Sequence, residues 1–551
     1  MSLTVTHAKV SAIADDPAAS AAGEVLPSDW NAAHVVTGAM SVFNAADFGA
    51  VGDGVSDDTV EIQAALNAAN DAGGGVVWIP PGTYKISNSL IVYSKTNVLG
   101  AGRGATTLRG TAGAYAGVTV NGGLIYCTIA MVSADNASVR SITVDHVTNG
   151  ATVNGIGILH DGAGTPSTGC VIEDCQVLGH ISHQYLIWNY KGIDSKIINN
   201  YVDGGSTTRD GTTGQEGIES YGGIGALIAG NTVKNIEQNG IYVWGDATSG
   251  YPTNLLIANN TVNGCFNGVR VSAPAYNVRI TNNHLKSNWE AGVKVTCSAG
   301  EVLDDVALVG NSIETSDIGV YAPCETGSVC RRLLIDGNSI GDTDNATGGA
   351  MQLHGVSNCI VSNNHIRDAS ANGIYVQDSS NLQVSGNIIN TVDYCGIIFI
   401  DVSKGGVLDN MLLEFNHGST SSSGVKMISS NNVLIDGNAL NWTNEAYPIY
   451  VTSSSSNRCI IGNGNRLLRN SYYNPTYRND GTNPNRSTVT ANAGATTTTV
   501  YNTLVNPSSQ IRVRQSAGPA LLILVNNIDH GSFDIVHAAA AGTETFAYEI
   551  A

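Results

Sequence analysis

Gly217-Ile218-Glu219-Ser220 returns 23 residues later as Gly240-Ile241-Tyr242-Val243 and then again as Gly268-Val269-Arg270-Val271. Each copy is a glycine followed by an apolar and a variable residue and, in most copies, a second apolar residue. Further copies begin at Gly292, Gly319, Gly373 and Gly424. The first five glycines are 23, 28, 24 and 27 residues apart. Self-similarity at a period of roughly 20–50 residues indicates a repeat array.

A second register runs through the same units, because an asparagine precedes a short, mostly apolar run in each of them. These asparagines are Asn200, Asn231, Asn260, Asn283, Asn311, Asn338, Asn364, Asn387, Asn410, Asn438 and Asn465. Asparagine tolerates the left-handed backbone of a tight turn, and its amide can bond to the same amide in the next unit. The units alternate with a period of two and show no helical pattern. We therefore predict an all-β parallel β-helix of about fourteen rungs over residues 84–470.

The chain enters this array through a run rich in glycine and aspartate, Asp47 to Thr59, followed by a helical pattern from Val60 to Asn70. Gly73-Gly74-Gly75 ends the helix, and a strand through Tyr84 follows. The run lacks the lysine of a phosphate-binding loop and the ligand spacing of an EF-hand. We expect residues 41–83 to form a capping helix and an entry strand at the open end of the solenoid.

The entrance block and the asparagine register resemble the pectate-lyase-like superfamily, over roughly residues 41–470. That superfamily contains glycoside hydrolases, polysaccharide lyases, mannuronan epimerases and phage tailspikes. The resemblance implies a right-handed parallel β-helix, and it is far less specific for the reaction, because one solenoid hosts several chemistries.

The two ends of the chain differ from the repeats. Residues 1–40 look like the short leaders of phage tail proteins, which implies attachment to a tail or baseplate; the alternative is a poorly ordered tail. Residues 471–551 contain alternating, threonine-rich segments, which predict an antiparallel β domain. Tailspikes of this layout end in domains that hold three chains together, so we expect a homotrimer. A carbohydrate-binding sandwich is the alternative.

Composition narrows the class of partner. The net charge of −19 argues against nucleic acid as a partner, because no basic stripe is available to displace counterions. It favours a neutral or weakly charged glycan as the partner. No stretch approaches the length of a membrane span, and the first residues lack the features of a secretory signal. We therefore expect assembly in the host cytoplasm and action outside the cell on a virion. The ten cysteines and the histidines at 160, 180, 183 and 354 show no metal spacing, so we expect no metal and no cofactor.

The repeat places the variable residues of successive units in columns on the outer surface. One column contains Trp188, Glu219, Tyr242, Arg270 and Lys294, and a second contains Tyr190, Tyr221 and Trp244. Rings of this kind stack on the apolar faces of sugars. The alternative is that the rings only stack on one another, as cross-strand pairs do.

Glycoside hydrolysis usually needs two carboxyl groups, and four lie beside these rings: Glu219, Asp246, Glu216 and Asp210. We predict Glu219 as the acid, because aromatic neighbours raise the pKa of a carboxyl group, and Asp246 as its partner. The alternative for each is a solvated surface charge.

A lyase would use the same columns differently, with Arg270 and Lys294 neutralising a uronate. The superfamily's epimerases carry Asp-Pro-His near this rung, whereas this chain has Glu219-Ser220-Tyr221, which argues against epimerisation. The clustered aspartates of calcium-dependent pectate lyases are not evident either. The sequence thus predicts a tailspike depolymerase that hydrolyses a bacterial surface polysaccharide, with a lyase or a non-catalytic glycan-binding spike as alternatives.

Overall fold

The computed structural model describes residues 41–111, 126–146, 154–159, 166–179, 185–206, 211, 214–246, 250–314, 316–344, 348–413, 423–440, 449–451, 459–462 and 465, and elsewhere only the backbone of strand residues. The chain divides into two compact units, Met1–His180 with Gly192–Tyr201, and Ile181–Lys191 with Val202–Ala551. The fold is an all-β right-handed parallel solenoid of about 13 turns with few helices, which confirms the predicted class. No helix in the described ranges is long and apolar enough to span a membrane.

In the first unit, strands one turn apart pair in parallel and form three sheets. One sheet contains β7 (Leu90–Val92), β12 (Cys127–Val132) and β15 (Asn154–Leu159). The second contains β3 (Val42–Asn44), β5 (Gly75–Ile79), β8 (Thr96–Gly100), β13 (Ser138–Arg140), β16 (Val171–Glu173) and β19 (Lys196–Ile198). The third contains β4 (Asp53–Asp57), β6 (Gly82–Ile86), β9 (Thr106–Gly110), β14 (Thr143–Asp145) and β17 (Gln176–Leu178).

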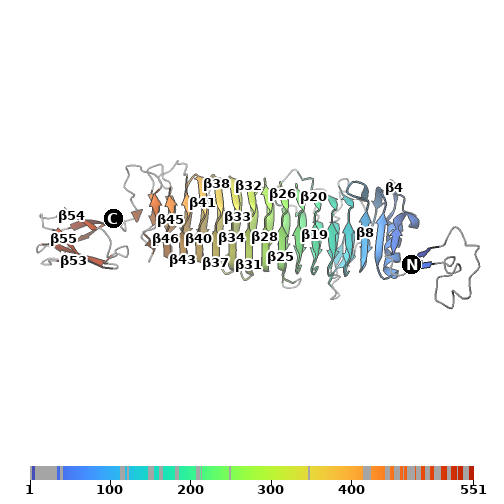
Figure 1. Cartoon of the computed structure of the whole chain (residues 1–551), viewed down its shortest axis with the longest axis horizontal. Helices are drawn as coiled ribbons and strands as arrows, with labels where there is room; N and C mark the ends of the chain where they lie inside the picture. The colour runs from blue at the N-terminus through green and yellow to red at the C-terminus, as the bar shows by residue number, and fades with distance from the viewer. Residues whose placement is uncertain are drawn as a thin grey trace, which may run out of the picture. The chain divides into compact units, whose positions relative to one another are not determined.

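The second unit repeats the same three-strand coil, and its rungs follow one another in Figure 1. Sheet 1 contains β18 (Tyr185–Tyr190), β21 (Glu216–Tyr221), β24 (Asn239–Trp244), β27 (Asn267–Ser272), β30 (Ala291–Thr296), β33 (Ile318–Pro323), β36 (Gly349–His354), β39 (Asn372–Gln377), β42 (Ile397–Ile400), β45 (Ser423–Ile428) and β48 (Tyr447–Val451). Sheet 2 contains β22 (Leu227–Ala229), β25 (Thr253–Ala258), β28 (Ala275–Thr281), β31 (Val302–Val309), β34 (Val329–Asp336), β37 (Val356–Ser362), β40 (Ser380–Ser385), β43 (Ser403–Leu408) and β46 (Asn431–Asp436). Sheet 3 contains β23 (Thr232–Lys234), β26 (Thr261–Asn263), β29 (His284–Lys286), β32 (Ser312–Ser316), β35 (Ser339–Thr343), β38 (His365–Ala369), β41 (Ile388–Val392), β44 (Met411–Leu412) and β47 (Ala439–Leu440).

The asparagine register forms a buried hydrogen-bonded ladder at the turn between sheets 2 and 3. The Asn283 side-chain oxygen accepts the backbone N–H and the amide of Asn260, both at 2.9 Å. Its own amide donates to the Ile257 carbonyl and to Asn311, both at 3.0 Å. The same pattern links the asparagines from Asn231 to Asn465. Every polar atom of a ladder amide is thus used, which lets it lie in the core.

The residue before a ladder asparagine makes the turn possible. It has positive φ where the structure describes it, as at Asn282 (φ 54°) and Gly310 (φ 66°). Glycine and asparagine adopt this left-handed conformation at low cost. The recurring Asn-Asn and Gly-Asn pairs therefore bend the chain and supply the ladder amide in two consecutive residues.

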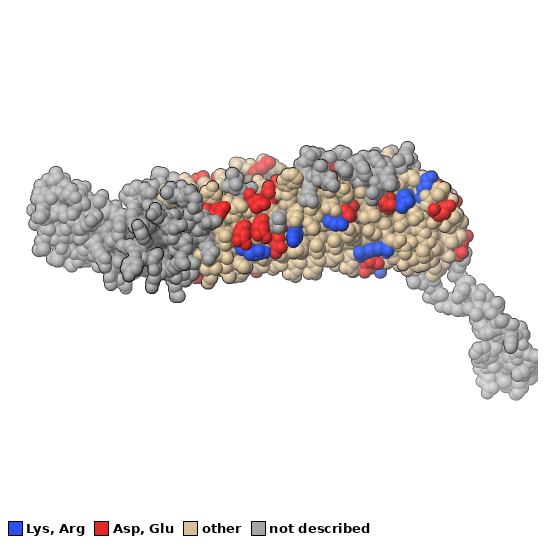
Figure 2. Space-filling view, turned by 90° about the horizontal axis from the view of Figure 1, so that it is seen from above, with Lys and Arg blue, Asp and Glu red and all other residues tan. Residues whose placement is uncertain are grey.

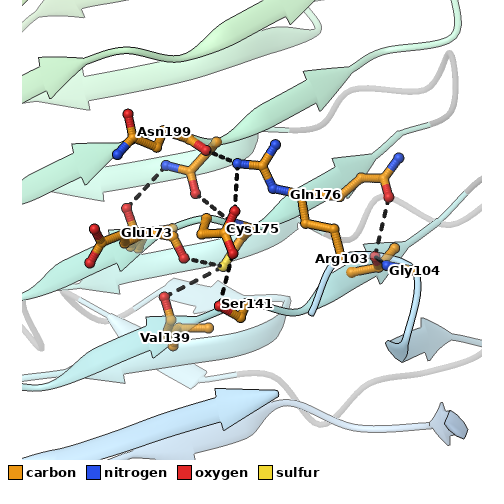
Figure 3. A network of polar contacts seen from close by, with 12 residues as sticks. Arg103, Gly104, Val139, Ser141, Glu173, Cys175, Gln176 and Asn199 are labelled. Carbon is orange, nitrogen blue, oxygen red and sulfur yellow. Dashed lines mark hydrogen bonds and ion pairs between the residues drawn. The ribbon is translucent and has the colours of Figure 1, made fainter. Parts of the chain in front are cut away.

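Figure 3 shows the ladder position in the first unit, where a cysteine replaces asparagine one rung before Asn200. The Cys175 N–H donates to the Asn200 side-chain oxygen at 2.9 Å, and the Cys175 thiol donates to the Val139 carbonyl. Arg103 reaches over this turn to pair with Asp174 at 2.8 Å and to bond the Asn199 carbonyl. All ten cysteines are free thiols and nine are buried, as expected of small apolar residues.

The repeat glycines meet a steric requirement. A Cβ at Gly292 would lie 2.2 Å from Ile313 Cγ2, and one at Gly319 would lie 2.4 Å from Ile340 Cγ2. These glycines lie where sheet 1 begins, against the inward aliphatic side chains of sheet 3. Only a residue without a side chain fits there.

The entrance contains α3 (Thr59–Asp71), close to the predicted helix. Its buried face, which includes Ile62 and Leu66, packs against β5 and β7. Asp58 accepts the N–H groups of Val51 and Gly52, so the preceding run is held by its own carboxylate. This supports the structural interpretation of the run, while its role as an end cap stays a prediction.

At the ends of the chain the structure gives only backbone pairing. Leu3–Val5 pairs antiparallel with His34–Val36, and the rest of the proposed leader lies outside the described residues. Strands β52 (Arg486–Thr490) to β57 (Thr545–Ile550) pair antiparallel, and a separate domain over residues 471–551 stays a prediction. Attachment and trimerisation stay predictions.

We predict that Asn311→Ala destabilises the solenoid by about 3 kcal/mol or more, because it leaves buried partners at Asn283, Asn338 and the Ile280 carbonyl unsatisfied. Chemical denaturation measures the loss. Asn263→Ala is the matched control, because Asn263 is exposed at the end of β26 in sheet 3. This substitution should change stability by less than about 0.5 kcal/mol. Equal losses of stability in the two variants would contradict a stabilising role of the ladder.

Candidate functional site

The predicted columns exist in sheet 1. Trp188 pairs in register with Glu219, Glu219 with Tyr242, Tyr242 with Arg270, and Arg270 with Lys294. The second column joins Tyr190 to Tyr221 and Tyr221 to Trp244. Strands β18 to β30 therefore bring eight of the predicted site residues into two adjacent rows. Asp210 lies outside the described residues.

The aromatic side chains differ from the open surface that we expected. Trp188, Tyr190 and Tyr221 are 8%, 7% and 9% exposed, whereas Tyr242 and Trp244 are half-buried. Tyr190 stacks on Tyr221 with ring centroids 5.3 Å apart, and the Tyr221 and Trp244 centroids are 4.3 Å apart. The rings therefore pack mainly on one another, and the partly exposed faces belong to Tyr242 and Trp244.

Sequence reasoning missed Tyr185, which extends this cluster. Its ring lies 4.8 Å from that of Trp188, centroid to centroid, and it pairs in register with Glu216. The available signal was the density of rings in β18, where Tyr185, Trp188 and Tyr190 fall within six residues.

Glu219 is buried, at 1% exposure, between two indoles. Its Oε1 accepts hydrogen bonds from Trp244 Nε1 at 2.9 Å and from Trp188 Nε1 at 3.2 Å. Burial raises the pKa of Glu219 to about 8, although the two indole N–H donors act in the opposite direction. Its Oε2 has no hydrogen-bond partner among the described residues. Glu219 is thus a protonated carboxylic acid at neutral pH, anchored through one oxygen.

Glu216 is neither exposed nor free. It is 3% exposed, and its two oxygens accept the backbone N–H and the side-chain amide of Asn239, both at 3.0 Å. Asn239 in turn accepts from the Asn267 amide at 3.0 Å. Burial, and then the nearby Glu219, raise the pKa of Glu216 well above its usual value. Its oxygens are used by a second short ladder, so the solvated-charge interpretation is wrong for Glu216.

Asp246 follows Trp244 and accepts a 2.5 Å hydrogen bond from the Tyr221 hydroxyl. Tyr221 packs on Trp244, which donates to Glu219. The two predicted catalytic carboxyl groups are therefore joined by one tyrosine and one tryptophan. Asp246 is half-buried, whereas Glu219 is buried.

The two cations of the first column have different surroundings. Lys294 pairs with Glu290 at 2.5 Å and lies 5.4 Å above the Tyr321 ring centroid. Arg270 lies 5.1 Å above the Tyr242 ring centroid, and its Nε donates to Ser272 Oγ at 3.2 Å. Ser272 also accepts from the Tyr242 hydroxyl at 3.3 Å. The charge of Lys294 is thus balanced by the carboxylate of Glu290, whereas the Arg270 guanidinium donates a hydrogen bond to the neutral hydroxyl of Ser272.

Comparison with known proteins supports the solenoid type. Residues 42–294 match the sequence model of "Rhamnogalacturonase A/epimerase, pectate lyase-like", and residues 304–410 match "Right handed beta helix region". The chain carries a pectate-lyase-like right-handed β-helix.

Curated relatives of this pectate-lyase-like chain match over short segments. The mannuronan C5-epimerase AlgE1 of Azotobacter vinelandii is 47% identical over 74 residues, which cover 12% of this chain and 5% of the epimerase. A probable glucan endo-1,3-β-glucosidase of Arthroderma benhamiae is 41% identical over 66 residues, covering 10% and 8%. The chain thus spans only a small part of these relatives.

Solved phage proteins share the fold of the pectate-lyase-like chain. Bacteriophage phi29 gene product 12 aligns with a TM-score of 0.54 and 16% identity, covering 80% of this chain and 57% of that one. A mutant tailspike of the E. coli bacteriophage HK620, solved with a pentasaccharide, aligns with a TM-score of 0.51 and 12% identity over 92% and 93%. At this identity the likeness concerns the fold alone.

The two carboxyl groups of the candidate site have different surroundings. Glu219 is in an environment that favours the neutral acid, and Asp246 is half-buried and receives a hydroxyl donor. Two carboxyl groups in different surroundings can divide the roles of acid–base catalysis.

We predict that Glu219→Gln stabilises the protein at alkaline pH. The raised pKa means that the folded state binds the extra proton below about pH 8, so this stability is lost as pH rises from about 4.5 through 8. A glutamine keeps an acceptor for both indoles and carries no charge. The melting temperature of the wild type should fall from about pH 5 to about pH 9, by the equivalent of roughly 3–5 kcal/mol from this group, and the variant's should fall less.

The exposed carboxylate Asp401 provides the control, since Asp401→Asn should leave the wild-type pH dependence unchanged. Parallel melting curves for wild type and Glu219→Gln across this range would show that Glu219 ionises normally.

Proposed function

We propose that this protein is a tailspike-type depolymerase that binds and hydrolyses a bacterial surface polysaccharide, such as a capsule, an exopolysaccharide or an O-antigen. The observation that carries the proposal is the buried acid Glu219, held by two indoles and joined through Trp244 and Tyr221 to Asp246. Glycoside hydrolysis usually requires two carboxyl groups, one of which is a protonated acid, and the raised pKa of Glu219 suits that role.

In the proposed reaction Glu219 protonates the oxygen of the glycosidic bond. Its Oε1 is fixed by the indoles, so Oε2 is the atom that would carry and deliver the proton. In the same step Asp246 would act either as the base that takes a proton from the attacking water (inversion) or as the nucleophile that attacks the sugar (retention). In the retaining case the ionised Glu219 would then take a proton from the water that releases the sugar. Tyr242 and Trp244 offer partly exposed rings for the apolar faces of the sugar.

The similar proteins support a role in polysaccharide chemistry. Their names include a rhamnogalacturonase/epimerase family, a mannuronan epimerase and a tailspike solved with a pentasaccharide. By analogy with the phage proteins we further propose a homotrimer on a virion, with residues 471–551 joining the subunits and residues 1–40 attached to the phage tail.

A lyase on the same columns is the second candidate, favoured by one observation. Arg270 has no carboxylate partner among the described residues, so it is available to neutralise a uronate before β-elimination. A non-catalytic spike would hold glycan on Tyr242 and Trp244 only. A lyase produces unsaturated ends that absorb in the near ultraviolet, a hydrolase produces reducing ends without that absorbance, and a spike produces neither.

We predict that Glu219→Gln and Asp246→Asn each lower depolymerisation by about 100-fold or more, with binding retained, because each removes a proton-transferring group and keeps the shape of the side chain. A panel of bacterial surface polysaccharides, assayed for new reducing ends, measures the loss. Asp401→Asn makes the same chemical change at an exposed position and should keep wild-type activity. Full activity in Glu219→Gln would remove this site from the mechanism.

We predict an alkaline limb in the pH dependence of kcat/KM with an apparent pKa of about 8. Glu219 must be protonated to act as the acid, and the pKa of Glu219 is about 8 in the free protein. Activity should therefore decrease above this pH. A constant kcat/KM from about pH 6 to about pH 10 would exclude Glu219 as the acid.

A further inference from the structure

The outer face of sheet 2 contains a groove that lies apart from the candidate site. The groove has a volume of about 580 Å³ and crosses strands β37, β40, β43 and β46. These strands and the candidate site belong to the same compact unit. Strand β39, which precedes β40 in the coil, is six strands from β21 in sheet 1, or about 30 Å along the stack. The groove is therefore outside the surface to which we assign catalysis.

A glycine opens this groove. The outward column of sheet 2 contains Ile360, Gln383, Gly406 and Leu434, which pair in register on the four strands. The backbone of Gly406 is not left-handed, and the atoms nearest to a Cβ built there belong to the Leu408 side chain, at 3.3 Å. The missing side chain leaves a gap between Gln383 and Leu434. The exposed side chains of Ile360 and Leu434 give this gap an apolar lining.

Polar side chains form a row along the groove. The row contains Asn358, Asn381, Lys404 and Asn432, one on each strand. All four have left-handed backbone, with φ of 51°, 55°, 63° and 55°. Asparagine adopts this conformation at low cost, whereas a lysine is strained there, and strain of this kind is found at ligand-binding positions.

The lysine of the row is also distinguished by its surroundings. Arg332 has the same place and the same left-handed backbone on β34, where Asp304 balances its charge at 2.7 Å. Lys404 has no carboxylate partner among the described residues. Its ammonium group is therefore available to a ligand.

The row offers hydrogen-bond donors and acceptors side by side. The Asn381 amide donates to the Asn358 side-chain oxygen, which leaves the Asn358 amide and the Asn381 oxygen without a side-chain partner in the described ranges. The Lys404 ammonium group and the Asn432 amide have no partner there either. A sugar hydroxyl both donates and accepts, so it can pair with each of these groups, whereas an anion pairs only with the donors.

An uncharged partner suits the surface of this protein. On the face seen in Figure 2, acidic and basic side chains form small groups within a surface that is mostly uncharged. The groove is similar, because Lys404 is the one charged residue among those described that line it. A second protein chain would bury the row of amides, and each amide left without a partner would weaken the contact. A short saccharide instead brings hydroxyls for the row and C–H faces for Ile360 and Leu434.

We propose that the sheet 2 groove is a second, non-catalytic saccharide-binding site, which holds another part of the polysaccharide chain that is bound at the candidate site. This inference rests on the proposed function for the identity of the polymer. Two sites that bind one chain raise the local concentration of the polymer at each of them. The groove thus keeps the protein on the polymer between cleavage events.

The test counts bound saccharides in the Glu219→Gln variant, which prevents turnover. The probes are bacterial surface polysaccharides and the oligosaccharides that partial acid hydrolysis releases from them, and calorimetry gives stoichiometry and affinity. We expect two oligosaccharides per chain, and one after Gly406→Leu, which fills the gap with the side chain that Leu434 has one rung away. Tyr242→Ala should remove the other one. The affinity for the intact polymer should fall at least about 10-fold in Gly406→Leu, because the second attachment is lost.

Lys404→Asn tests the polar row, since it gives this position the residue of its neighbours and removes the ammonium group. Oligosaccharide binding at the groove should weaken about 5-fold or more. The melting temperature should not fall, because asparagine suits the left-handed backbone. Lys286→Asn is the matched control: Lys286 is exposed on sheet 3, outside the groove, and its substitution should leave binding unchanged.

Two kinds of result would overturn the second site. One is a stoichiometry of one oligosaccharide per chain before Gly406→Leu, or of two after it. The other is a smaller particle mass of Gly406→Leu in light scattering, which would make the groove a contact between copies of this chain. Binding as expected, without new reducing ends from the wild type, would overturn the proposed hydrolase and leave the second site standing. The absence of binding to every polymer would overturn both.

Discussion

The structure depends on one repeated turn, in which a residue with left-handed backbone is followed by a buried asparagine. The asparagine amide bonds to the backbone and to the equivalent asparagine of the next rung. This bond has a fixed length, so it sets the register of each rung against its neighbour. A slip by one residue would turn every core side chain outward and leave the amides unsatisfied in the core. The ladder therefore specifies the coil as well as stabilising it.

The ladder fixes the register of each rung, and the same register aligns the residues of sheet 1 that form the candidate site. Because equivalent residues lie directly above one another, Trp188, Glu219 and Tyr242 become neighbours although they are widely separated in sequence. Ionising a carboxyl group between two indoles costs free energy, so burial favours the neutral acid. The paired strands on both sides keep the group in this position. A buried carboxyl group of this kind lowers the stability of the fold when it ionises, and such losses of stability are common at functional sites.

The electrostatic environment of a charged side chain in this protein is set by its near neighbours more than by the net charge. The net charge is strongly negative, yet the described arginines other than Arg270 are matched to carboxylates. The two buried glutamates of the site favour their neutral forms, whereas Asp246 retains a hydroxyl donor. The electrostatic potential over this part of sheet 1 therefore depends on these neighbouring groups more than on the overall charge.

The sequence by itself determined the coil, the ladder and the columns, because all three follow from a period that can be counted along the chain. The glycines before each column and the Asn-Asn or Gly-Asn turns carry that period without help from distant contacts. Burial was decided only by the tertiary structure. Alternation shows that Trp188, Tyr190 and Tyr221 leave the sheet on its outer side, but not that neighbouring rings cover them. Glu216 shows the same limit: it lies at the strand start, where the alternation ends and Asn239 binds it.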